Sequence, residues 1–167
     1  SIKIYSWRTT LYTQLIAATE VDGNPVQIGY RLERGVYFSS SNDDYTDHFV
    51  EASGDFELNS RHRISALAQY EDGHEDRGTG FSIGSGLNIT SPDTYKSSNL
   101  SAEYNYGAAT TNGMLTFKAR RQTLDYDRTE DVYIIRDRVK NMVGAEFGYQ
   151  VGAATSMVVD VTNTFIK

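Results

Sequence analysis

The feature that most constrains the fold is a strict alternation of apolar and polar residues. Over residues 50–58, the even positions hold Val, Ala, Gly, Phe and Leu, and the odd positions hold Glu, Ser, Asp and Glu. Successive side chains of a β-strand point to opposite faces, so this run predicts a strand with one apolar and one charged face. At helical spacing the same charges would scatter around the axis, and a helix is therefore not predicted.

This alternation recurs along the chain and predicts about eight strands and no convincing helix. The further runs cover residues 28–38, 64–71, 100–106, 115–120, 143–151 and 157–162, with a less regular first strand over residues 5–20. Only two prolines occur in the 167 residues, which suits long strands because proline cannot donate to a β-ladder. No apolar stretch reaches the roughly 18 residues that a membrane helix needs.

The connections between these runs alternate between short and long. The short ones lie near residues 21–25, 59–61, 108–112 and 152–155, and the long ones at residues 39–47, 72–98 and 127–137. Outer-membrane barrels combine short periplasmic turns with long extracellular loops, whereas a soluble sandwich has no reason to sort its loops this way. The longest regular runs, over residues 28–38, 50–58 and 143–151, span 9–11 residues, which is the length of a membrane strand.

Aromatic residues gather near the predicted strand ends, as in the girdles of membrane barrels. They include Phe38, Tyr70 and Tyr126 near the long loops and Phe56, Tyr106 and Tyr149 near the short turns. The alternative is that strands are simply rich in Tyr and Phe. We predict an all-β, antiparallel up-and-down transmembrane β-barrel in the bacterial outer membrane. The side chains expected to face lipid are those of Val50, Ala52, Phe56, Ala66, Ala102, Phe117, Ala145 and Phe147.

The chain ends lead to a prediction of incompleteness. With the short turns in the periplasm, both termini lie on the extracellular side, whereas complete bacterial barrels normally begin and end in the periplasm. Eight strands alone enclose a bore only wide enough for side chains, and the charged residues here would crowd it. We therefore expect residues 1–167 to form a single segment, an internal fragment of a longer barrel, whose first and last strands do not pair with each other.

Several stretches together resemble the β-barrel porin 2 family. They are residues 37–49 (YFSSSNDDYTDHF), 59–64 (NSRHRI), 70–80 (YEDGHEDRGTG), 91–95 (SPDTY) and 136–138 (RDR). The Arg-His-Arg turn and the Gly-Thr-Gly loop follow one another in order and at plausible spacing.

The resemblance covers roughly residues 25–167 and implies an outer-membrane barrel associated with exopolysaccharide production and export. Members of the family are usually much longer, in line with the fragment hypothesis. The family supplies no catalytic residues to carry over to this sequence.

Motifs that could carry chemistry each have a simpler interpretation. Residues 80–84 match the G-x-S-x-G pattern of hydrolases. In hydrolases the serine lies on a turn between a strand and a helix, but no helix is predicted after these residues. His48, His62 and His74 fall at different ends of the predicted strands, so a catalytic triad is not expected. Acidic clusters at residues 43–47 and 71–76 could bind calcium, but solvated loop charge explains them as well. We predict no enzyme, no catalytic or metal-ligating residues and no cofactor.

The charged side of the strands is the best functional candidate. Its residues could line a wet pore, or could form cross-strand ion pairs that seal the interior, and the sequence does not choose between these. The pore-lining candidates are Arg31, Glu33, Glu51, Asp55, Glu57, Arg63, Glu71, Glu103, Lys118, Arg120 and Glu146.

Three functions compete. The first is a passive outer-membrane channel serving polysaccharide export, and the second is a non-conducting outer-membrane scaffold or surface-binding protein that uses its long loops. The third is a soluble β-sandwich or lipocalin-like barrel with its apolar face inward. The expected partners are outer-membrane lipid and lipopolysaccharide, and in the export role polysaccharide and export-machinery proteins. A net charge of −6 without a basic patch argues against nucleic acid.

Overall fold

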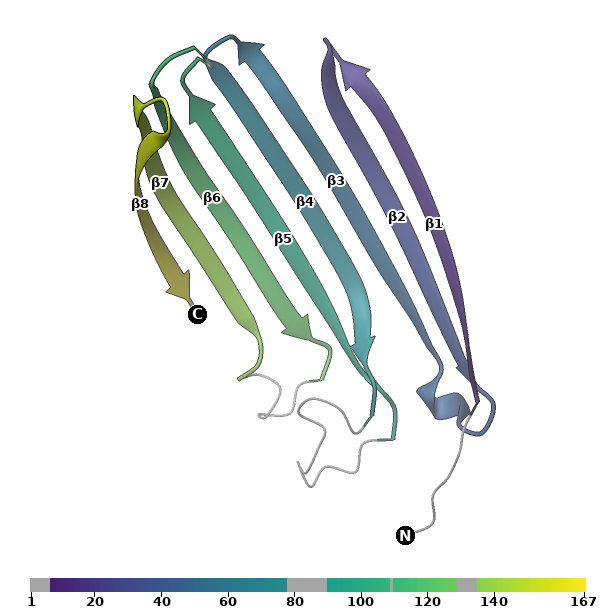
Figure 1. The fold of residues 1–167 in the computed structure, drawn as a ribbon. Coiled ribbons are helices and arrows are strands. Elements are labelled where there is room, and N and C mark those ends of the chain that lie inside the picture. Colours follow the sequence, from purple (N-terminus) through teal and green to yellow (C-terminus); the bar gives the residue numbers. More distant parts are fainter. Residues whose placement is uncertain (1–6, 78–89, 109, 129–134) are drawn as a thin grey trace.

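The computed structural model describes residues 7–77, 90–108, 110–128 and 135–167, which form a single curved sheet (Figure 1). The strands are β1 (Arg8–Val21), β2 (Asn24–Tyr37), β3 (Tyr45–Asn59), β4 (His62–Glu75), β5 (Asp93–Tyr106), β6 (Gly113–Tyr126), β7 (Arg138–Gly152) and β8 (Thr155–Ile166). A short 3-10 turn, η1 (Ser41–Asp43), precedes β3. Among the described residues, no helix is long and apolar enough to span a membrane.

Each strand pairs with its sequence neighbours in the order β1 to β8, and every pair is antiparallel. The predicted all-β antiparallel meander is therefore confirmed. The expected first strand over residues 5–20 begins at Arg8, and residues 1–6 lie outside the described part of the chain.

The alternation of short and long connections is also confirmed. The β1–β2 turn consists of Asp22 and Gly23, whose φ angles are 50° and 77°. Positive φ at both central residues defines the tight turn that matches the twist of a hairpin, and Asp-Gly is a preferred pair for it. The strand ends that border the long connections lie at the opposite end of the sheet, together with the start of β1 and the end of β8 (Figure 1).

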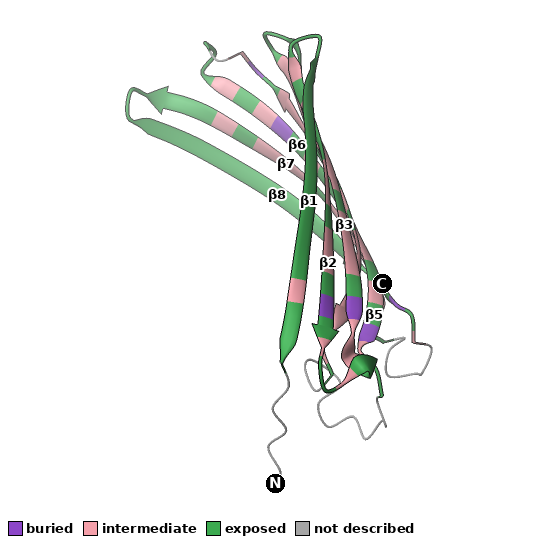
Figure 2. Cartoon of the chain, turned by 90° about the vertical axis from the view of Figure 1, so that its right-hand side faces the viewer, coloured by how far each residue is buried: buried purple, intermediate pink, exposed green. Residues whose placement is uncertain are grey.

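The sheet curves but its outer edges do not meet. Figure 2, viewed from the β1 side, shows β7 and β8 swinging away from the plane of β2 and β3. In the described chain, β1 pairs only with β2 and β8 only with β7. The prediction that the first and last strands do not pair is confirmed.

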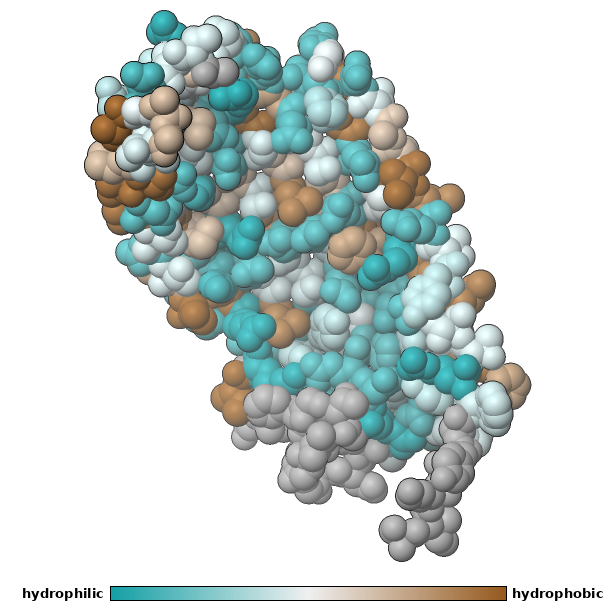
Figure 3. All heavy atoms as spheres, in the orientation of Figure 1, coloured by the Kyte–Doolittle hydropathy of each residue, from teal (hydrophilic) through white to brown (hydrophobic). Residues whose placement is uncertain are grey.

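The register sorts side chains onto two faces, because directly paired residues share a face. The concave face, seen in Figure 3, is largely hydrophilic along the middle strands. The convex face carries the apolar set, and Phe117, Val143 and Val161 are 48%, 53% and 68% exposed there. The only hydrophobic residues buried in the described part are Tyr45 and Tyr126, both on the concave side. These residues therefore build no interior apolar core.

Candidate functional site: the concave polar face

The concave face carries every pore-lining candidate predicted from the sequence. Pairings such as Glu33 with Asp47 and Glu103 with Lys118 place neighbouring candidates side by side on this face. The side chains of Ala66 and Phe117, expected to face lipid, lie on the opposite face with the rest of that set. The two-sided assignment of the strands is thus confirmed, although the register does not establish what either face contacts.

Charge on the concave face separates between the two halves of the sheet. Acidic side chains dominate β3 to β5, with Glu51, Asp55, Glu57, Glu71 and Glu103 on this face. Basic side chains dominate β6 and β7, where the face carries Lys118, Arg120, Arg138 and Lys140. The acidic wall of β3 to β5 therefore adjoins the basic wall of β6 and β7, and Glu103 lies directly opposite Lys118 at their boundary.

Neutral polar side chains connect the two walls. The Nε2 atom of Gln69 donates to Oε2 of Glu51 at 2.6 Å, and Nδ2 of Asn99 donates to Oε1 of Gln69 at 2.7 Å. The same cross-strand row continues through Gln122 to Lys140. A ladder of amides therefore crosses the face between the acidic and the basic side, where it offers hydrogen bonds without charge.

Some of the charge is neutralised within the sheet. The Nζ atom of Lys118 lies 2.6 Å from Oε2 of Glu146 and 3.5 Å from Oδ2 of Asp160. Opposite charges across adjacent strands stabilise a sheet. This triad is an example of the cross-strand ion pairing that we gave above as the alternative to a pore lining.

Other charges of the same face stay open to solvent. A hollow of about 320 Å³ is lined by Asp55 and Glu103 on one side and by Lys118 and Arg120 on the other. Within the described chain, Asp55 and Arg120 make no hydrogen bond or ion pair. The face thus combines paired charges with charged side chains that are unpaired and open to solvent.

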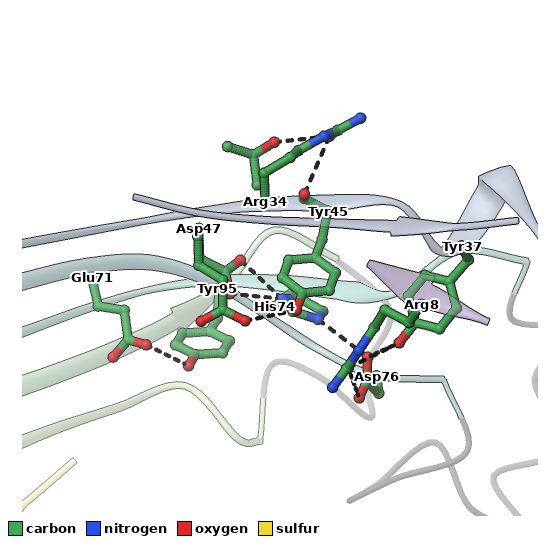
Figure 4. Close-up of polar contacts among 11 residues, drawn as sticks. Arg8, Arg34, Tyr37, Tyr45, Asp47, Glu71, His74, Asp76 and Tyr95 are labelled. Atoms are coloured by element: carbon green, nitrogen blue, oxygen red, sulfur yellow. Dashed lines mark hydrogen bonds and ion pairs between the residues drawn. The ribbon is translucent and has the colours of Figure 1, made fainter. Parts of the chain in front are cut away.

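A compact polar cluster closes the concave face at the end with the long connections (Figure 4). The ring of Tyr45 stacks on His74 with centroids 3.6 Å apart, and its hydroxyl donates to Oε1 of Glu33 at 2.7 Å. The Nδ1 atom of His74 lies 2.9 Å from Asp47, and its Nε2 atom lies 3.2 Å from Asp76. The cluster links β2, β3 and β4.

Glycine makes room for this cluster. Gly35 lies opposite Tyr45, and a Cβ atom at position 35 would fall 2.1 Å from the tyrosine ring. Gly73 and Tyr95 repeat the arrangement on β4 and β5, where a Cβ atom would lie 3.1 Å from the ring. The sequence analysis missed both pairs, because the pairing of a glycine with a tyrosine depends on the register across a connection.

A second cluster ties Arg136, which precedes β7, to the concave face. The Nη2 atom of Arg136 donates to Oε1 of Glu75 at 2.7 Å, and the guanidinium lies 4.0 Å from the centroid of the Tyr126 ring. The Tyr126 hydroxyl donates to the same Glu75 oxygen at 2.7 Å. Tyr126 is 5% exposed and lies on the concave side. Its predicted place in an aromatic girdle is therefore wrong, because a girdle residue would point outward.

Acidic residues of the two predicted loop clusters have basic partners. Asp43 pairs with Arg77, Asp44 lies 3.7 Å from Arg34, and Asp76 lies 3.7 Å from Arg8. The hydrogen bond from Arg77 holds the pKa of the Asp43 carboxyl below its ordinary value. Over the residues that the structure describes, no group of three or more side chains is placed to hold a metal ion.

The three histidines lie apart, as expected. His48 and His62 are on the convex face near opposite ends of the sheet, and each contacts a tyrosine hydroxyl. His74 belongs to the Tyr45 cluster. The serine-containing motif at residues 80–84 lies outside the described residues.

Comparison of the chain with family models, with curated proteins and with solved structures finds no match.

Proposed function

We propose that this chain is part of an outer-membrane β-barrel that acts as a passive channel, with its convex face toward lipid and its concave face toward water. One observation carries the proposal: large apolar side chains are uncovered on the convex face, while charged and amide side chains gather on the concave face. A soluble sheet would cover its apolar face with a second layer. A membrane strand instead alternates apolar outward and polar inward.

The height of the apolar band fits a membrane. At the long-connection end it is bordered by the Tyr30 hydroxyl, 2.8 Å from Nδ1 of His48, and at the short-turn end by the Tyr104 hydroxyl, 2.5 Å from Nδ1 of His62. Tyr70, in the row of Tyr30, is eight residues from His62 along β4, or about 27 Å. At the usual strand tilt of about 35–45°, this length gives a height of about 19–22 Å, close to the roughly 25 Å of the apolar band in outer-membrane barrels.

The eight described strands do not close into a barrel, because β1 and β8 do not pair with each other. The outer edges of β1 and β8 present backbone groups without partners in the described sheet, and each such group costs several kcal/mol in hydrocarbon. We propose that further strands pair with both edges and form a wider barrel. Such a barrel leaves room for water beside the charges of the concave face.

The proposed cargo is exopolysaccharide, and the resemblance to the β-barrel porin 2 family supports it. The amide ladder through Gln69 and Asn99 offers hydrogen bonds of the kind that sugar hydroxyls make. Tyr95 is half-buried beside the buried Tyr126, with ring centroids 5.7 Å apart, and it adds polar aromatic surface at the long-connection end.

A non-conducting surface-binding scaffold is the second candidate. It is favoured by ion pairs at the bases of the long connections. Arg136 pairs with Glu75 at the end of β4, and Arg77, which follows β4, pairs with Asp43 of η1. Loops held in this way would present a defined surface to a partner.

Conductance of the purified protein in planar bilayers tests the proposal. We expect discrete current steps, whose cation preference falls when Asp55 is replaced by Asn. A protein that inserts into the bilayer and never conducts would contradict the channel and favour the scaffold.

A further inference from the structure

Three basic residues of the described strands point to the convex face. Arg34 lies 3.7 Å from Asp44 and Lys96 lies 2.7 Å from Asp127, and Arg121 is the third. Arg121 follows Arg120 on β6 and therefore points to the convex face, between Leu100 of β5 and Asn141 of β7. Within the described residues, its guanidinium makes no hydrogen bond or ion pair. A cation on a lipid-facing surface without a counter-ion is costly, and such residues are usually functional.

The position of Arg121 allows its charge to reach the membrane surface. Thr123 shares the Tyr70 row that borders the apolar band, and Arg121 is two residues inside that row, about 7 Å along the strand. A long arginine side chain can extend over that distance while its methylenes stay on apolar surface. Its guanidinium would then lie at headgroup level, on the side of the long connections.

Arg121 also stands at the end of an apolar groove. The groove has a volume of about 680 Å³, within the range of ligand pockets, and runs over the convex surface of β3 to β7. Its lining includes Ala68, Ala102 and Ala119, whose small side chains leave it hollow, and it reaches Leu100, Arg121 and Asn141. An occupant that matches both parts has an apolar chain and an anionic head.

We propose that Arg121 and Asn141 bind the phosphate of an outer-leaflet glycolipid, and that the groove takes one of its acyl chains; this rests on the proposed membrane orientation. Guanidinium binds phosphate through two parallel hydrogen bonds, and the Asn141 amide can donate another. The nearest acid on the same face of β6, Asp125, lies four residues away, about 13 Å, and is too distant to neutralise Arg121.

The test measures binding of bisphosphorylated lipid A and of dephosphorylated lipid A to the detergent-purified full chain, by native mass spectrometry. We expect at least a tenfold preference for the phosphorylated lipid. Arg121→Gln should abolish that preference, whereas Arg138→Gln, the same substitution on the concave face and outside the groove, should keep it. Ala119→Leu should weaken the binding of both lipids to the same extent, because it fills the groove and leaves the Arg121 guanidinium in place.

Folding is checked for each variant by its β-sheet circular dichroism signal. If Arg121→Gln does not fold, Arg121→Lys replaces it and should retain only part of the preference. Equal binding of both lipids to wild type, an unchanged preference in Arg121→Gln, or lipid-free dimers that depend on Arg121 would overturn the inference. Failure of the wild type to insert into lipid vesicles would instead overturn the proposed function itself.

Discussion

The two faces of the sheet are built from the same strands but hold their side chains in opposite ways. On the concave face, polar groups are tied to one another, as in the Lys118–Glu146 pair and the Gln69–Glu51 hydrogen bond. On the convex face, apolar side chains such as Val161 and Phe117 are open to the surroundings. The hydrophobic effect favours removing such side chains from water, so the convex face needs an apolar environment that the described chain does not supply.

The largest effect is expected from a charge placed on the convex face. Ala66→Arg lies in the middle of the apolar band and should lower the free energy of unfolding in lipid vesicles by about 2–4 kcal/mol. Ser65→Arg is the matched control, because it lies on the concave face between Asp55 and Glu103. We expect this control to be tolerated. Equal losses for the two variants in urea titrations would show that the faces do not differ in environment.

A smaller effect should come from tight packing on the concave face. Gly35→Ala forces the Tyr45 ring away from its place over β2 and should destabilise the protein by about 1–3 kcal/mol, as overpacking does elsewhere. Gly29→Ala, on the same strand and face, meets only Leu15 O at 3.9 Å and should be neutral or slightly stabilising. The comparison is read from thermal or urea unfolding of the two variants. A harmless Gly35→Ala would mean that the Tyr45 cluster is loosely held.

Removing a carboxylate from each face in turn should change ion selectivity differently, and the expected free-energy change is smaller than in the two comparisons above. Asp55→Asn removes an unpaired carboxylate from the concave face and should reduce the preference for cations. The change is about 0.4 kcal/mol, or roughly twofold, for a unit charge about 10 Å from an ion in water. Asp125→Asn removes the same charge from the convex face and should leave reversal potentials unchanged. A shift of similar size in both variants would place Asp125 in the conducting path.

The smallest expected effect concerns the link between η1 and Arg77. Because the hydrogen bond from Arg77 lowers the pKa of Asp43, its stabilisation is present at neutral pH. It is lost as pH falls through that lowered pKa, below the ordinary value of about 3.9. This partly exposed pair should contribute only about 0.3 kcal/mol. Thermal midpoints between pH 5 and 2 should fall slightly less steeply in Asp43→Asn than in wild type, with Asp22→Asn as control. Identical slopes of the thermal midpoint against pH in all three proteins would show that the Asp43–Arg77 pair does not contribute to stability.

Sequence reasoning went furthest where the strands alternate strictly. The period of two over residues 50–58 determined which side chains share a face, and the short connection predicted near residues 21–25 is the tight turn between β1 and β2. It went less far where position depends on pairing across strands, as for Tyr45 over Gly35. Arg121 was missed because the run over residues 115–120 stops just before it. Tyr126 was misassigned because proximity to a strand end does not determine the face on which a side chain lies.

The central claim is that the convex face contacts lipid and the concave face contacts water. The chain contains no cysteine, so single cysteines introduced at successive positions 63–70 of β4 can each carry a spin label. In lipid vesicles, electron paramagnetic resonance measures how strongly a collision partner accelerates the spin relaxation of each label. Oxygen should have the larger effect on labels at even positions, and a water-soluble nickel complex should have the larger effect on labels at odd positions. An alternation of period two with that phase is the predicted result. The opposite phase, or equal nickel accessibility at all positions, would contradict the account.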